Sequence, residues 1–422
     1  MKNLQLGDLR HYAPRPGDAD LEACDAAARE LAEIIAPLIR KSADLSAADR
    51  LRDARRRARA LALFGRNFTI NRRKLRKGDH ALRPLYAIWT MLNQCNFRCT
   101  YCDNHQGHAY YDVDDPGRLD TVGGKRLLEL IHSGTPALYW CGGEPTLRDD
   151  LPELLDYSWD LGFFPNMINT NGFNIHQRLQ QRAWRDFLWQ MDVVVVSLDA
   201  LNQRLLRKLW GVSKTEQVLV NLLLLRRLRE LVKFKLSVNT VISEQTLDEA
   251  RAVLDLCADL DLWFVPVPVN QGHRPSESLL QNPDYQALAE LILQRKADGQ
   301  KIIGSATLLG RLLYCRPHTC YTTLKPHIWS DGSLCWPCRA PVNVEPQDIN
   351  LLKFDSFDQA YAAGRKLVNP DNFHGPAANQ CGGECAWMQN YTTSRYAEGL
   401  LHPLQSGIVG EIAEFALNPA KW

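Results

Sequence analysis

The sequence lacks a hydrophobic run long enough to cross a membrane. Its apolar run at residues 218–225 is interrupted by Asn221 and is followed by two arginines, whereas a membrane helix needs about 20 apolar residues. The amino-terminal residues also lack the apolar core of a signal peptide. We therefore expect a cytoplasmic protein, and we leave peripheral contact with a membrane open.

A large excess of charge and low-complexity sequence are also absent. Lys and Arg number 50 and Asp and Glu number 48, which gives a formal net charge of +2, so the overall charge does not point to a polyanionic partner. The ordinary apolar and charged fractions exclude disordered and fibrous classes. The 422 residues are enough for one large catalytic domain and one or two smaller appendages.

Cysteine is abundant, with twelve residues. Because the cytosol keeps thiols reduced, we interpret these cysteines as metal ligands rather than as a disulfide framework. One tight group contains Cys95, Cys99 and Cys102. A looser group near the carboxyl terminus contains Cys315, Cys320, Cys335, Cys338, Cys381 and Cys385.

Short β-rich runs alternate with amphipathic helical stretches in the middle of the chain. This alternation is typical of a parallel α/β domain. The six candidate strands are residues 85–92, 137–141, 165–170, 192–198, 234–242 and 263–269. We therefore predict an α/β fold, a partial (β/α)6 TIM-like barrel, whose functional residues gather at the carboxyl ends of the strands.

The sequence texture divides the chain into three predicted domains. Residues 1–83 are expected to form a helical, basic amino-terminal extension, because apolar positions recur at helical spacing and strand patterns are absent. Residues 84–270 are expected to form the barrel. Residues 271–422, rich in Pro, Gly and Cys, are expected to form a small Cys-rich domain.

The first cysteine group directly follows the first predicted strand. Its spacing is C-x3-C-x2-C. Three thiolates leave one iron of a 4Fe-4S cube without a protein ligand, so that iron is open to a small molecule. A structural zinc site normally takes four protein ligands. The trio therefore favours an iron-sulfur cluster over zinc.

This motif, with Tyr101 before its last cysteine, resembles the signature of the radical S-adenosylmethionine (SAM) superfamily. A second motif, Cys141-Gly142-Gly143-Glu144-Pro145 at the end of the second predicted strand, resembles the GGEP motif of that family. The resemblance covers about residues 85–270. In that family the open iron binds SAM, and one electron cleaves SAM to methionine and a 5′-deoxyadenosyl radical, which abstracts a hydrogen atom.

The resemblance implies cofactors, an electron donor and site residues. The implied cofactors are a 4Fe-4S cluster on Cys95, Cys99 and Cys102 and SAM itself, with an external donor such as flavodoxin or ferredoxin. In the family pattern Glu144 and nearby backbone hold the amino group of SAM, while Ser197 and Asn239 contact its carboxylate or ribose. Asp199 is equally suited to capping the following helix or loop. The candidate SAM-contacting residues are Tyr101, Gly142, Gly143, Glu144, Pro145, Asn171, Ser197 and Asn239.

The carboxyl-terminal cysteines resemble the SPASM or twitch extensions of radical SAM enzymes. In these extensions a cysteine, a later Asp-Gly hairpin ending in Pro-Cys and a final cysteine pair bind an auxiliary 4Fe-4S cluster. On that template the ligands are Cys320, Cys338, Cys381 and Cys385. Cys335 could replace Cys338, and Cys315 could replace Cys320. A structural zinc site and ordinary buried thiols remain alternatives.

A basic segment, Arg50 to Lys77, contains almost no acidic residues. Contact with anionic lipid headgroups, with a phosphorylated substrate or with nucleic acid would each use such a segment. We consider an anionic membrane surface and do not expect a nucleic-acid partner. The alternative is a solvated helix that docks on the barrel through an apolar face made of Leu51, Ala54, Ala58 and Leu61.

The sequence thus predicts a radical SAM enzyme of the oxidoreductase or transferase type. Its substrate is left open among a lipid or isoprenoid, a small polar metabolite and a peptide, because the fold does not decide the steps after hydrogen abstraction. The alternative is a zinc-binding nucleic-acid or scaffold protein without SAM chemistry. That alternative explains the basic segment and the carboxyl-terminal cysteines but leaves the ordered motifs at the strand ends unexplained.

Overall fold

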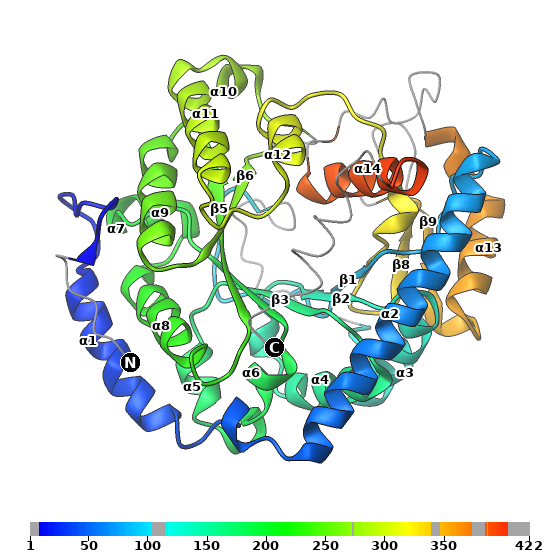
Figure 1. The fold of residues 1–422 in the computed structure, drawn as a ribbon, viewed down its shortest axis with the longest axis horizontal. Helices are drawn as coiled ribbons and strands as arrows, with labels where there is room; N and C mark the ends of the chain where they lie inside the picture. The colour runs from blue at the N-terminus through cyan, green and yellow to red at the C-terminus, as the bar shows by residue number, and fades with distance from the viewer. Residues whose placement is uncertain are drawn as a thin grey trace.

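The computed structural model describes residues 8–102, 115, 117–271, 274–338, 347–373, 385 and 387–403. A curved sheet lies at the centre, with helices around its outer side and a long helix along one flank (Figure 1). The strand order is β6-β5-β4-β3-β2-β1-β7-β8-β9. Because β6 and β9 are the two edges of this sheet, the barrel is open rather than closed.

Six parallel strands form the barrel, as the sequence predicts. They are β1 (Ala87–Thr90), β2 (Leu138–Cys141), β3 (Asn166–Thr170), β4 (Val193–Ser197), β5 (Lys235–Ile242) and β6 (Trp263–Pro268). Each pairs in parallel with the next. The predicted partial (β/α)6 barrel is therefore confirmed, and each observed strand falls within its predicted range.

The connecting helices cover the outer face of these strands. They are α3 (Thr121–Gly134), α4 (Leu151–Leu161), α5 (Ile175–Leu179), α6 (Phe187–Gln190), α7 (Gln203–Trp210), α8 (Thr215–Leu228) and α9 (Leu247–Asp259). Outward-facing Trp89 and Trp140 are fully buried, with ring centres 5.3 Å apart. Since side chains alternate along a strand, their neighbours Ile88 and Tyr139 face the inside of the barrel.

The first helix of the chain packs on the barrel helices. Asp20 caps α1 (Leu21–Ile35) by accepting a hydrogen bond from the backbone N–H of Ala23. Asp25 of α1 forms a buried ion pair with Arg227 of α8 at 2.6 Å. This pair fixes α1 against the outer layer of helices.

The long helix α2 (Ala47–Arg76) lies across the amino-terminal edge of the sheet. Arg56 bonds Asp192, which directly precedes β4. Asn67 donates a hydrogen bond of 2.8 Å to the carbonyl of Gly134, a residue that shortly precedes β2. Further along α2, Asn71 donates to the carbonyl of Arg83 at 2.9 Å, shortly before β1. The helix therefore covers the end of the barrel opposite the carboxyl ends of the strands.

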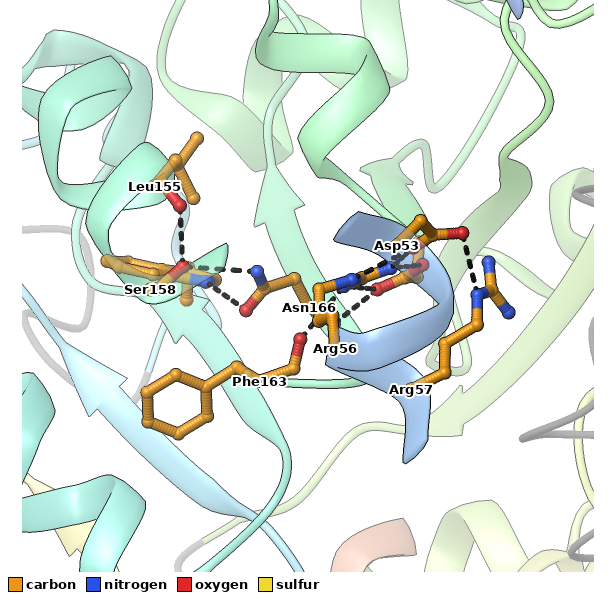
Figure 2. A network of polar contacts seen from close by, with 9 residues as sticks. Asp53, Arg56, Arg57, Leu155, Ser158, Phe163 and Asn166 are labelled. Carbon is orange, nitrogen blue, oxygen red and sulfur yellow. Dashed lines mark hydrogen bonds and ion pairs between the residues drawn. The ribbon is translucent and has the colours of Figure 1, made fainter. Parts of the chain in front are cut away.

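The face by which α2 docks differs from the apolar face that the sequence suggests. Leu51 and Leu61 are 50% and 51% exposed, and both alanines of that face are exposed. Arg56 and Arg57 are buried instead and share the carboxylate of Asp53 (Figure 2). Docking through the apolar face is therefore wrong. The physical reason is that this edge of the sheet presents carbonyls and a carboxylate, which need hydrogen-bond donors.

The carboxyl-terminal region extends the same sheet. β7 (His327–Ile328) pairs in parallel with β1, and β8 (Ser333–Trp336) and β9 (Gln347–Asn350) continue it antiparallel. The helices of this region are α10 (Glu277–Gln281), α11 (Pro283–Ala297), α12 (Ala306–Leu313), α13 (Phe357–Leu367) and α14 (Met388–Leu401). Within the described residues, no helix is both long and apolar enough to cross a membrane.

Candidate functional site

The loop that follows β1 carries the first cysteine group, Cys95, Cys99 and Cys102. Two backbone hydrogen bonds fix this loop to the end of α7. The N–H of Arg98 donates to the carbonyl of Trp210, and the N–H of Thr100 donates to that of Leu209, both at 2.8 Å. The loop therefore has a defined position above the carboxyl end of the sheet.

The turn that follows β2 fits closely against the cysteine loop. The N–H of Gly143 donates to the carbonyl of Leu92 at 2.9 Å, and that of Glu144 donates to the carbonyl of Gln94 at 2.8 Å. A Cβ atom at position 143 would lie 1.9 Å from the Gln94 oxygen. Only glycine permits this approach, so the Gly-Gly pair joins the two motifs that the sequence singles out.

Glu144 connects the turns after β2 and β3. Its side chain is buried and accepts hydrogen bonds from Thr146, from the Thr170 hydroxyl at 2.6 Å and from the Asn171 N–H at 2.7 Å. Burial raises the pKa of this carboxyl, although the hydrogen bonds oppose the shift. Pro145 begins the short 3-10 helix that follows. Direct contact of Glu144 with SAM stays a prediction.

Asn171 lies against the cysteine loop. The Asn171 side-chain amide donates a hydrogen bond to the side-chain oxygen of Asn96 at 2.7 Å. The Asn171 side chain also hydrogen-bonds the Cys95 thiol. The backbone N–H of Phe97 also donates to the Cys95 sulfur at 3.4 Å. Asn171 thus supports the first cysteine from the end of β3.

Tyr101 is oriented by Asp199, a relationship that the sequence analysis did not anticipate. The Tyr101 hydroxyl donates to the Asp199 carboxylate, which also accepts from the Trp210 indole and the Val241 N–H, each at 2.8 Å. Asp199 is fully buried, and burial raises its pKa. Helix α7 is capped instead by Asn202. A helix-capping role for Asp199 is therefore wrong.

The three thiols of the loop suit a metal cluster. All three are free of disulfides. Burial raises the pKa of Cys95 to about 12 and that of Cys99 well above its usual value, with further contributions from nearby carboxylates and from the other thiols of the loop. Thiolates are therefore unfavourable here without compensating positive charge, which a bound iron-sulfur cluster would supply.

The described residues contain no group of three or more His, Cys, Asp or Glu side chains arranged to hold one metal ion. A mononuclear zinc site needs its ligands to converge on one atom. In a 4Fe-4S cube, by contrast, each of the three thiolates would bond a different iron. The first cysteine group supplies three thiols of the kind that such a cube needs.

A cavity of about 660 Å³ fills the inside of the barrel. At the carboxyl ends of the strands it is lined by Tyr101, Cys102, Gly142 and Asn239, four residues that the sequence analysis singled out. Ser197 is half-buried and is paired in register with Asn239. The interior of a closed (β/α)8 barrel is filled by side chains, whereas the described residues of this open barrel line a cavity.

The sequence analysis missed several residues that line the cavity. Thr90 and His327 hydrogen-bond across β1 and β7 at 2.7 Å. Asn169 and Lys235 also line the cavity, from β3 and β5. Alternation within each strand could have indicated Asn169 and Lys235. The pairing of β7 with β1 that brings in His327 has no signal in the sequence.

The predicted auxiliary ligands lie in several elements of the carboxyl-terminal region. Cys335 lies in β8, and its thiol donates to the carbonyl of Cys338 at 3.3 Å. Cys320 is buried, with its sulfur 3.9 Å from the Thr393 hydroxyl. Cys385 is buried. The remaining candidate, Cys381, lies outside the described residues, so the ligand set stays a prediction.

Cys315 and Cys385 both lie near Tyr391 at the start of α14. Burial raises the pKa of Tyr391, and these two cysteines raise it further. The His318 ring stacks on Tyr391 at 4.1 Å between ring centres. Cys315 stays the predicted alternative to Cys320 in the auxiliary site.

Comparison with known proteins identifies the central part of the chain. Residues 89–257 match the model of the radical SAM superfamily. These residues form a radical SAM domain. The match runs from β1 almost to the end of α9, so the radical SAM domain contains both the cysteine loop and the Gly-Gly-Glu turn.

Curated relatives match this chain over part of their length. Fe-coproporphyrin III synthase of Methanosarcina barkeri is 33% identical over 28% of this chain and 28% of its own length. PqqA peptide cyclase of Bradyrhizobium diazoefficiens is 28% identical over 42% of this chain and 44% of its own length. This chain therefore spans less than half the length of these two relatives.

Solved structures share the fold beyond the radical SAM domain. The structure of native anSMEcpe with bound AdoMet, which is SAM, is 16% identical and covers 80% of this chain and 99% of its own, with a TM-score of 0.53. Streptococcus suis SuiB bound to SAM is 21% identical and covers 68% of each chain, with a TM-score of 0.51. At such identities the likeness concerns the fold alone.

Proposed function

We propose that this chain is an enzyme that reductively cleaves SAM and uses the product to abstract a hydrogen atom from a substrate in the barrel. When bound, a 4Fe-4S cluster on Cys95, Cys99 and Cys102 would deliver one electron to SAM and give methionine and a 5′-deoxyadenosyl radical. The observation that carries this proposal is the position of the three cysteines on the loop after β1, one of which, Cys102, lines the cavity at the carboxyl ends of the strands.

The residues around this mouth would hold and orient SAM. Gly142 and Asn239 line the cavity beside Cys102, where backbone and amide groups are suited to binding polar parts of SAM. Asp199 keeps the Tyr101 ring in place by accepting its hydroxyl proton in a hydrogen bond. The largely apolar wall of the cavity would limit the access of water to reactive species.

Anaerobic reconstitution tests this proposal. We expect about eight irons per chain in the wild type, from two clusters, and about four in a Cys95, Cys99 and Cys102 triple Ala variant. Formation of 5′-deoxyadenosine with a chemical reductant should be lost in the variant. Reduced flavodoxin or ferredoxin should replace the chemical reductant. A wild type without iron, sulfide and SAM cleavage would contradict the proposal and favour the zinc-binding alternative.

An auxiliary 4Fe-4S cluster in the carboxyl-terminal region is part of the same proposal. It is supported by the hairpin of β7 and β8, whose turn contains Asp331 and Gly332 and which leads to Cys338. Cys335, which lies in β8, and Cys385 are both buried. A cluster with four thiolate ligands has no open iron, so its role would be electron relay or support of the substrate pocket.

We also propose that the exposed face of α2 contacts an anionic membrane surface. Arg55, Arg59 and Arg66 are exposed on this face, together with Leu51 and Leu61. Basic residues near an anionic surface contribute about 1 kcal/mol each to binding. Exposed leucines would insert between headgroups.

Vesicle sedimentation tests the membrane contact. We expect the wild type to sediment with phosphatidylglycerol vesicles and not with phosphatidylcholine vesicles. A triple variant, Arg55→Gln with Arg59→Gln and Arg66→Gln, should bind the anionic vesicles roughly a hundredfold less tightly. The matched control replaces two exposed arginines of other helices, Arg126→Gln and Arg251→Gln. It should bind the anionic vesicles as tightly as the wild type does. Equal sedimentation of both variants would contradict the proposal.

A further inference from the structure

Helix α7 presents a row of cations to solvent beside the cysteine loop. Arg204, Arg207 and Lys208 are exposed, and their spacing of three and four positions puts them on one face of the helix. Leu206 and Trp210, on the opposite side, are buried. These three cations form the basic face of α7, which takes no part in packing the helix on the barrel.

The charge of this face is not neutralised by the described residues. Residues 203–215 contain no Asp or Glu, and none of the three cations pairs with an acidic side chain in the described part of the chain. The next acidic residue, Glu216, accepts a hydrogen bond from Gln203. Lys214 adds a fourth exposed cation, whose ammonium group lies 4.6 Å from the centre of the Phe173 ring. An aromatic face stabilises a cation without removing its charge, so this surface has a positive potential.

The stability of the helix does not account for all of these cations. Arg207 and Lys208 lie in the last turn of α7, where the helix dipole favours a cation. Arg204 lies in the first turn, where the same dipole makes a cation unfavourable. A positive surface that extends along the whole helix therefore points to a role outside the helix itself.

The carboxyl end of α7 lies directly against the cysteine loop. The carbonyl of Trp210 accepts a hydrogen bond from the N–H of Arg98 at 2.8 Å. The Trp210 ring also packs on that of Phe97, with 5.1 Å between the ring centres. Arg204 lies six residues before Trp210, which corresponds to about 9 Å along a helix axis. The whole basic face of α7 therefore lies within two helical turns of the cysteine loop.

Electron delivery is a process that needs a surface at this place. The proposed cleavage consumes one electron for each SAM, and an external carrier must supply it. Electron tunnelling slows steeply with distance, so the carrier must bind close to the cysteine loop. Electron-transfer proteins form small, transient interfaces of less than about 1,200 Å², and complementary charges speed and orient their encounter. A short basic helix beside the cysteine loop meets both requirements.

We propose that the basic face of α7, together with Lys214, is the docking surface for an acidic one-electron carrier protein. The inference rests on the proposed function, because it concerns the partner that starts SAM cleavage. The carrier is oxidised by one electron, which passes to SAM through the cluster on Cys95, Cys99 and Cys102. No atom is transferred across the interface, so contact between the two surfaces is sufficient.

Calorimetric titration of the reconstituted holoprotein with a flavodoxin of net negative charge tests the docking surface. The charge-reversal variant Arg204→Glu with Arg207→Glu and Lys208→Glu should bind this flavodoxin about tenfold less tightly than the wild type does. The difference should shrink as the ionic strength rises, because salt screens exposed charges. Should this variant fail to fold, Gln at the same three positions is the milder change, with about threefold weaker binding expected.

A matched control carries the same total change of charge on other elements. Lys77→Glu, Lys353→Glu and Lys366→Glu replace three exposed cations, at the end of α2, in the turn after β9 and on α13. Helix α13 lies on the side of the molecule opposite α7 (Figure 1). This control should bind flavodoxin as tightly as the wild type does.

Formation of 5′-deoxyadenosine gives a second readout on the same proteins. With limiting reduced flavodoxin, the rate should fall about tenfold in the α7 charge-reversal variant and stay unchanged in the control. Photoreduced deazariboflavin, a small uncharged reductant, should support equal rates in all three proteins. A general loss of cluster or of SAM binding would lower the rate with both reductants.

Several results would overturn the inference. One is equal flavodoxin affinity of the α7 variant and the control. Another is weaker binding of the α7 variant to phosphatidylglycerol vesicles with unchanged flavodoxin binding, which makes this face a lipid surface. Cleavage of SAM with deazariboflavin, but equal flavodoxin-driven rates, refutes this inference alone. A wild type that cleaves no SAM with either reductant contradicts the proposed function, and the calorimetric comparison then still decides whether the docking surface exists.

Discussion

Arg56 of α2 and Asp192 form a buried two-point ion pair at the amino-terminal edge of the barrel. Both nitrogen-oxygen distances are 2.9 Å, and the two side chains are 1% and 3% exposed. Asp192 also accepts a hydrogen bond from the backbone N–H of Asn166. Arg56 donates to the carbonyl of Phe163 (Figure 2). Since α2 forms one end of the cavity, this pair determines the shape of that end.

Removing one partner of this pair should destabilise the protein. We expect Arg56→Met to lower the free energy of unfolding by about 3–5 kcal/mol, because the Asp192 carboxylate is left buried without its charge partner. Urea denaturation measures the change. The control Arg55→Met, at the exposed neighbouring position, should change stability by about 0.5 kcal/mol or less. Equal effects at the two positions would contradict the structural role of the pair.

Gly143 should tolerate no side chain. In Gly143→Ala the new Cβ atom would lie 1.9 Å from the Gln94 carbonyl oxygen, so the cysteine loop must move. We expect this variant to lose the iron of the first cluster and most SAM cleavage, measured by iron analysis and 5′-deoxyadenosine formation. Gly65→Ala on α2, where the added Cβ has no neighbour within 4 Å, should keep both and gain about 0.5–1 kcal/mol of stability.

Asp199 should act as a positioning residue for Tyr101. Asp199→Asn replaces one of its two acceptor oxygens by a donor, so three hydrogen bonds from neighbours cannot all be kept. We expect a higher KM for SAM and a changed electron paramagnetic resonance signal of the SAM-bound cluster. Tyr101→Phe should show the same change more weakly. The control is Tyr157→Phe, whose hydroxyl bonds Glu129 on the outer surface; a similar KM change there would refute the positioning role.

Iron content should distinguish the auxiliary ligands from their neighbours. We expect Cys320→Ala and Cys338→Ala each to lower iron from about eight to about four per chain, because an auxiliary 4Fe-4S cluster loses a ligand. Cys315→Ala and Cys335→Ala should retain about eight. If Cys315→Ala lowers the iron content and Cys320→Ala does not, Cys315 is the ligand. The same comparison decides between Cys335 and Cys338. Zinc in place of the second set of irons would make the site structural.

The sequence indicated the barrel and its cysteine loop because both depend on local patterns. Six apolar runs separated by amphipathic stretches are enough to predict six β/α units. The spacing of Cys95, Cys99 and Cys102 is likewise a local property. The hairpin of β7 and β8 was expected only through the family resemblance, as an Asp-Gly hairpin ending in Pro-Cys, and β9 was missed. These strands contain two to four residues each, too few for a periodic pattern to be recognised.

The docking of α2 was not readable from the sequence. An arginine-rich helix with scattered leucines suggests that the leucines face the core, since charged side chains are seldom buried. The buried partner of Arg56 is Asp192, 136 positions away, and only folding brings them together. The same holds for Tyr101 and Asp199, which lie 98 positions apart.

By itself, the sequence determined the class of fold, the cysteine loop and the turn that follows β2, because each is encoded by neighbouring residues. Only the tertiary structure decided that the described residues of the barrel line a cavity, that the wall of this cavity is largely apolar, and that α2 covers one end of the barrel. These properties depend on which side chains of separate strands share the inner face and on long-range pairs such as Arg56 with Asp192. The order of residues along the chain does not specify them directly.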